Sequence, residues 1–159
     1  MPTAMPYNKD RHRAIKEETK KYEDAQGGCE ELSHEKLVIN GEAKSLPVYR
    51  LHVDSLAFNK ANGRIKAEVF EKEAELGRQL DEWDKTDQLI IRDILLSIRK
   101  EENDKIAEDL EKNGQMRPGI ITCDGVVING NRRKALLESL REKTHNKKYA
   151  FLDVQILPC

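Results

Sequence analysis

The chain has 159 residues, of which 38% are hydrophobic and 36% are charged, and this predicts one modest hydrophobic core together with a solvated appendage. Its 28 Lys and Arg residues against 29 Asp and Glu residues give a net charge of −1. This balance excludes the strong positive field of a general nucleic-acid binder, so any anion site must be local.

The N-terminal segment, residues 1–34, is polar and charge-dense. Residues 9–24 have some helical character, but their apolar side chains are too few for a core-facing stripe, and we predict a partly flexible, loosely packed arm. The domain itself is expected over residues 35–159. It opens with a predicted β-hairpin over residues 36–53, because two β-branched runs flank Asn40-Gly41, a pair that suits a tight turn.

A turn is predicted around Asn59, Asn62 and Gly63, before a long acid-rich helix. Leu76, Leu80 and Trp83 recur in that segment at i, i+4 and i+7, which is the spacing of one helical face. The carboxylates of this segment could supply a Mg²⁺ ligand or a general base, but their helical spacing is more typical of a solvated helix face.

Two further helices are predicted before the next strand. The first starts near Thr86, a candidate N-cap. The second is capped by Asn103 or Asp104 and ends at Asn113-Gly114, where glycine can close a helix. One apolar face of the first of these helices consists of Ile91, Ile94, Leu95 and Ile98.

The last part of the chain alternates strands with a helix. Pro118 forbids helix, and GIITC, the Asp124-Gly125 turn and VVIN predict a second hairpin, with Asp124 as a turn residue. A helix follows from residue 131, and residues 149–157 predict a final strand. The fold class is therefore α+β, a small mixed sheet with helices packed around it.

The turn into the last helix carries the main chemical signal. Gly130 allows a sharp turn, and the free N–H groups and positive dipole end of the helix favour an anion. Arg132 and Arg133 oppose that dipole by about 0.3–1 kcal/mol each when exposed, so a bound phosphate would compensate them. Alternatively, both arginines are solvated or pair with acidic side chains.

Residues 105–140, KIAEDLEKNGQMRPGIITCDGVVINGNRRKALLESL, resemble the ParB N-terminal/sulfiredoxin-like superfamily. The likeness lies in the order of helix, Gly-Gln–Pro turn, strand, Asp-Gly turn, strand and Gly-x-Arg-Arg series. Residues 46–65 are similar to that family's first strand and its Asn/Arg loop, so the resemblance covers about residues 36–158. Residues 66–103 look like a helical insertion.

The resemblance implies a small α+β domain that binds a nucleotide's phosphates at the glycine–arginine turn. Members of the family use this pocket differently: partition proteins bind and hydrolyse CTP as DNA clamps, sulfiredoxins use ATP to rescue oxidised cysteine, one branch phosphorylates free serine, and others are described as nucleases. Asn131 stands where sulfiredoxins have their cysteine and partition proteins commonly a glutamate. This excludes sulfiredoxin chemistry, for which Cys123 is no substitute, and favours binding over hydrolysis.

By this resemblance the phosphate-contacting residues are Gly130, Arg132 and Arg133, with Asn131 on the same turn. Arg64 is a weaker partner, and Gln115 is expected to line the pocket. We expect a ligand such as CTP or ATP with Mg²⁺ and a role in a DNA-linked process, and assign no catalytic residue. The alternatives are a metal-dependent ParB-like nuclease and a non-enzymatic DNA-binding module that forms a homodimer through helices in residues 66–100.

The remaining side chains of interest carry weaker signals. The cysteines Cys29, Cys123 and Cys159 form no CxxC pair, which favours incidental thiols in a reducing, cytoplasmic compartment. No apolar run approaches a membrane span, so no membrane partner is expected. The scattered histidines are assigned no metal or catalytic role. A basic group could follow a DNA backbone; it consists of Arg132, Arg133, Lys134, Arg141, Lys143, Lys147 and Lys148.

Overall fold

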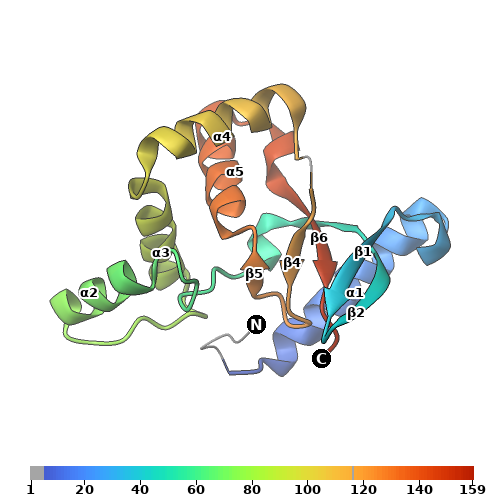
Figure 1. The fold of residues 1–159 in the computed structure, drawn as a ribbon, viewed down its shortest axis with the longest axis horizontal. Coiled ribbons are helices and arrows are strands. Elements are labelled where there is room, and N and C mark those ends of the chain that lie inside the picture. Colours follow the sequence, from blue (N-terminus) through green and yellow to red (C-terminus); the bar gives the residue numbers. More distant parts are fainter. Residues whose placement is uncertain (1–5, 116) are drawn as a thin grey trace.

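A four-stranded mixed sheet forms the centre of the fold (Figure 1) in the computed structural model, which describes residues 6–115 and 117–159. The strands are β3 (Tyr49–His52), β4 (Gly119–Ile121), β5 (Val127–Asn129) and β6 (Phe151–Ile156), in the order β3-β6-β4-β5. β6 pairs antiparallel with β3 and parallel with β4, whereas β4 and β5 are antiparallel. The predicted α+β class is confirmed.

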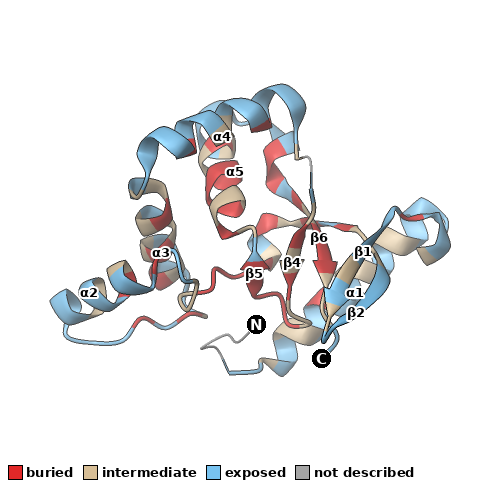
Figure 2. Cartoon of the chain, viewed as in Figure 1, coloured by how far each residue is buried: buried red, intermediate tan, exposed pale blue. Residues whose placement is uncertain are grey.

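The helix α5 (Asn131–Thr144) follows β5 and has more buried residues than any other helix in the described part of the chain. Its leucines join side chains from all four strands in the main core, and Figure 2 shows the buried residues concentrated in α5 and the sheet. A second cluster, around Phe58 and Ile65, fills the space between α5 and the helices that precede it in the chain. Within the described residues, no helix combines the length and apolar character needed to cross a bilayer.

The predicted tight turn at Asn40-Gly41 is confirmed, and it joins β1 (His34–Ile39) to β2 (Glu42–Pro47). Both turn residues have positive φ, 51° and 79°, which is the backbone of a type I′ turn. The hairpin is a separate two-stranded sheet, because the chain leaves β2 and pairs β3 with β6 instead. The Gln155 side chain ties the two sheets together by donating to carbonyls in both strands of the hairpin.

The N-terminal segment differs from the loosely packed arm that its composition predicts. Residues 9–26 form the helix α1 (Lys9–Gln26), which begins at an Asn8 cap and buries Ile15 to 2% exposure in the main core. Polar contacts complete the docking, since Glu18 accepts from the His52 N–H at 2.8 Å and Tyr49 donates to Glu23. One buried isoleucine gives no periodic signal, which explains the difference. Residues 1–5 of the predicted arm lie outside the described residues.

The acid-rich helix ends earlier than predicted. α2 (Lys66–Leu76) stops at Gly77, which caps the helix with φ 68°, so Leu80 and Trp83 lie in the following loop and not on a helical face. Leu80 is nevertheless buried there. Glu71 and Glu75 are exposed, as a solvated helix face predicts, whereas Glu73 of α2 and Glu82 of the loop pair with Lys60 at 3.2 and 3.4 Å.

A second ion pair closes the same loop. Arg78 donates to both carboxylate oxygens of Asp87 at 2.8 and 2.9 Å, and these bonds hold the pKa of the Asp87 side chain at about 2. Asp87 also accepts from the Asp81 N–H at 2.7 Å. The loop between α2 and α3 (Lys85–Ser97) is therefore fixed from both ends.

The caps of the next two helices differ from the prediction. Asp84, not Thr86, caps α3 by accepting from the Asp87 N–H. α4 (Lys100–Asn113) starts three residues before Asn103, whose buried side chain instead donates to carbonyls at the end of α3. The acceptors are Leu95, Leu96 and Ile98. The predicted end of α4 at Asn113-Gly114 and the apolar face of α3 are confirmed.

Candidate functional site

A cavity of about 640 Å³ lies where α5 begins, within the size range of small-molecule sites. Its walls come from loop 59–64, the end of β5, the first turn of α5, Leu95 of α3 and Ile106 of α4. Five of the six predicted site residues line it, and four of them, Gly130, Asn131, Arg132 and Arg133, come from the turn. Arg64 joins them from the opposite loop. Segments far apart in sequence thus meet at the predicted turn.

The turn between β5 and α5 leaves backbone donors without a partner among the residues that the structure describes. Gly130 has φ 116°, and a Cβ at this position would lie 3.5 Å from the Gly119 Cα. The first ladder bond of α5 runs from the Lys134 N–H to the Gly130 carbonyl at 2.9 Å, and no side chain caps the helix. The N–H groups of residues 131–133 therefore precede the ladder and form the positive end of the helix.

Arg132 is the most informative side chain of the cavity. Its side chain is only 11% exposed, and its Nη1 lies 3.4 Å from a Glu102 oxygen. Its Nη2 is buried and has no hydrogen-bond partner within the described ranges 6–115 and 117–159. Burial and the nearby Arg64 guanidinium lower the pKa of the Arg132 side chain. Since arginine stays protonated in proteins, the site holds a concentrated positive charge with one unused donor.

Arg133 is the next residue of the same turn and also lines the cavity. Its Nη1 donates to the Arg117 carbonyl, and burial lowers the pKa of its side chain. Its Nη2 lies 3.9 Å from the position that a Cβ on Gly130 would take, so the guanidinium is next to the glycine backbone. The two arginines and the helix N–H groups thus present donors to a common space.

Asn131 does not offer its side chain to a ligand, in contrast to the expectation that it contacts phosphate. The residue is 2% exposed, its Oδ1 accepts from the Asn59 N–H at 3.0 Å, and its Nδ2 donates to the Val127 carbonyl at 2.9 Å. Both ends of the amide are therefore used inside the protein. Asn131 fastens loop 59–64 to the turn, and so builds the cavity.

Loop 59–64 carries Arg64 to the rim of the cavity. The Asn59 Oδ1 accepts from the Ala61 N–H at 3.0 Å, and the Asn62 Oδ1 accepts from the Arg64 N–H at 2.9 Å. These two side-chain turns fix the predicted bend, and the following residue, Ile65, is fully buried. The exposed Arg64 side chain is thereby anchored at its base.

Gln115 lies away from this cavity, contrary to the prediction that it lines the pocket. Its side-chain amide pairs with the backbone of Asp153 in β6, accepting from the N–H at 2.7 Å and donating to the carbonyl at 2.9 Å. It also donates to the Arg117 carbonyl. Gln115 thus acts like a strand residue beside β6, because its amide pairs with both backbone groups of Asp153.

The basic group of the last helix does not form one continuous surface. Lys134 is buried, 2.9 Å from Glu138 and over the Phe58 ring, so it faces the core. Arg141 pairs with Asp54. Within the described residues, only Lys143, Lys147 and Lys148 of this group are exposed. The cavity, in contrast, has no Asp or Glu among its lining residues in the described ranges.

The cysteines depart from the prediction of incidental thiols. Cys123 and Cys159 form a disulfide with a Cα separation of 5.5 Å, and only Cys29 of the three is free. His12, for which the sequence predicts no metal or catalytic role, lies beside this bond. These residues have no spacing signal, because 36 residues separate the cysteines and 147 separate Cys159 from His12. Asp124 is confirmed as a turn residue, since it accepts from Thr122 and from the Asn8 N–H.

Comparison with protein-family models, curated proteins and solved structures finds no match to this chain. The resemblance to the ParB N-terminal/sulfiredoxin-like superfamily therefore stays a prediction. The physical arrangement of the cavity is the basis for a functional hypothesis.

Proposed function

We propose that this chain is a nucleotide-binding domain that holds the phosphates of a nucleoside triphosphate at the Gly130–Arg133 turn, and that it acts in a DNA-linked process. One observation carries the proposal: Arg132, whose buried Nη2 has no partner among the described residues, lines a cavity together with the uncapped start of α5. A phosphate oxygen is an acceptor that satisfies both the guanidinium and the helix N–H groups.

The size and charge of the cavity support a nucleotide over a single phosphate ion. About 640 Å³ accommodates a base and sugar beside the phosphates, and the apolar wall includes Leu95, Ile106 and Ile128. A bound Mg²⁺ would be held by the phosphates, because the lining residues within the described ranges offer no carboxylate. For the same reason we favour binding over hydrolysis and rank a metal-dependent nuclease lower.

The test is a thermal-shift panel of CTP, ATP, GTP and UTP, each with and without Mg²⁺. Ligand at a hundredfold excess over Kd stabilises the folded state by about 2.7 kcal/mol, so at least one nucleotide should raise Tm by about 5 °C or more. Arg132→Ala should lower the affinity for that nucleotide about tenfold or more, because the substitution removes a charge-assisted bond to phosphate.

Lys143→Ala is the matched control, since it removes one positive charge from the exposed end of the same helix, outside the cavity. It should keep the affinity of the unaltered chain. If no nucleotide shifts Tm, or if the two variants lose equal affinity, the proposal is wrong.

The other candidate is a DNA-binding module that holds a DNA phosphate at the same turn and dimerises through helices in residues 66–100. The exposed lysines Lys143, Lys147 and Lys148 favour it over the nuclease. Duplex DNA in the same panel distinguishes it, because DNA binding falls steeply with salt and needs no nucleotide.

A further inference from the structure

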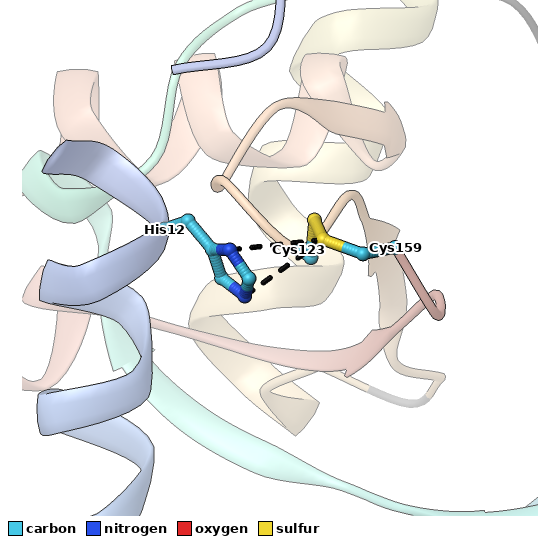
Figure 3. Close-up of side chains that lie close together, drawn as sticks. All are labelled: His12, Cys123 and Cys159. Carbon is cyan, nitrogen blue, oxygen red and sulfur yellow. Dashed lines mark hydrogen bonds between the residues drawn. A yellow bond between two sulfur atoms is a disulfide. The ribbon is translucent and has the colours of Figure 1, made fainter. Parts of the chain in front are cut away.

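Three side chains of types that can bind metals meet outside the cavity (Figure 3). His12 comes from α1, Cys123 from the turn between β4 and β5, and Cys159 from the segment after β6. Their ligand atoms all lie within 4.8 Å of one another. The Cys159 sulfur is 3.7 Å from Nδ1 and 3.8 Å from Nε2 of the imidazole ring. The cluster of His12, Cys123 and Cys159 is therefore formed by three segments that the fold brings together.

The donor set is typical of zinc once the disulfide is opened. Two thiolates and one imidazole bind Zn²⁺ at about 2.3 Å and 2.0–2.1 Å, and a tetrahedron of that size places its ligand atoms about 3.5–3.8 Å apart. The sulfur–nitrogen distances of 3.7 and 3.8 Å already match this spacing. Only the two sulfur atoms must move apart. Rotation of the two cysteine side chains can provide this separation, because their Cα atoms are 5.5 Å apart.

Tyr7 contacts the imidazole of His12. The Tyr7 hydroxyl lies 2.5 Å from His12 Nδ1, and the two rings pack edge to face. When the hydroxyl oxygen accepts from the Nδ1–H, the neutral imidazole keeps its Nε2 lone pair free for a metal. Asp124, next to Cys123, accepts from the Asn8 N–H at 3.0 Å and so holds the turn against the start of α1.

We propose that Cys123, Cys159 and His12 form a Zn²⁺ site when a dithiol reductant opens the disulfide. Two electrons and two protons pass from the dithiol to the S–S bond, giving two thiols and a cyclic disulfide of the reductant. Zn²⁺ then displaces one proton from each thiol, and water takes the fourth position. The oxidised chain keeps the covalent link and binds no metal there. The same three segments are thus joined in both redox states.

Co²⁺ titration tests this proposal. The chain is reduced with a dithiol, freed of it by anaerobic gel filtration, and titrated with Co²⁺ as a spectroscopic probe. We expect one equivalent of Co²⁺ to give thiolate-to-cobalt charge-transfer bands and the visible bands of a four-coordinate site, and Zn²⁺ to displace it. The unreduced chain should give neither band.

Variants assign the ligands. Cys159→Ser should lose at least half of the charge-transfer intensity and bind Co²⁺ at least tenfold more weakly, and His12→Ala should weaken binding at least tenfold. Cys29→Ser is the matched control, because the Cys29 thiol contacts Tyr49 and not this cluster. Absence of charge-transfer bands in the reduced chain overturns the proposal. So do bands that survive unchanged in Cys159→Ser, or that Cys29→Ser abolishes.

Discussion

At the scale of single residues, the candidate site depends on which polar atoms are used within the protein and which are not. Asn131 uses both ends of its amide, whereas Arg132 keeps a buried Nη2 without a partner among the described residues. Sequence reasoning placed both on one turn and could not separate their roles. Adjacent side chains in the first turn of a helix point in different directions, and only the surrounding backbone decides which becomes buried.

Asn131→Ala should destabilise the fold by about 2 kcal/mol or more. The change leaves the Asn59 N–H and the Val127 carbonyl without their partner in a buried setting, and each such loss costs about 1–3 kcal/mol. Urea denaturation measures the effect. Asn129→Ala, at the exposed last position of β5, should stay within about 0.5 kcal/mol. Equal stability of the two variants would show that the Asn131 amide does not hold loop 59–64 to the turn.

At the scale of elements, some apolar patterns and turn motifs were predictable, whereas the Leu76, Leu80 and Trp83 spacing gave no helical face and single anchors left no signal. The apolar face of α3 and the Asn40-Gly41 turn followed from periodicity and turn chemistry. The docking of α1 depends on Ile15 and on carboxylates that accept backbone N–H groups, as Glu18 does from His52. Such contacts are set by the tertiary structure, so no local spacing signals them.

Ile15→Ala should cost about 2–4 kcal/mol of unfolding free energy, because the isoleucine is buried in the main core beside Gly125. The measurement is again urea denaturation, followed by circular dichroism. Lys16→Ala, one position along the same helix and exposed, is the control and should change stability little. A negligible effect of Ile15→Ala would mean that the segment is the loose arm that its composition predicts.

At the scale of the whole molecule, the α+β class followed from the order of strands and helices, but the long-range pairings did not. The central place of β6 between β3 and β4 joins the last segment to strands from both halves of the chain. That pairing also brings Cys159 to Cys123, and α1 adds His12. A sequence without repeated spacing cannot specify which distant cysteines meet, since this depends on the sheet topology.

The nucleotide proposal is also a claim about the whole molecule, because four segments must close one cavity around the start of α5. The most direct measurement is a titration of the isotopically labelled chain with CTP, ATP or inorganic pyrophosphate, followed by amide NMR. We predict saturable shifts that are largest for the N–H groups of residues 130–133 and extend to loop 59–64. Shifts centred instead on Lys147 and Lys148, or none that saturates with any of the three probes, would contradict the account.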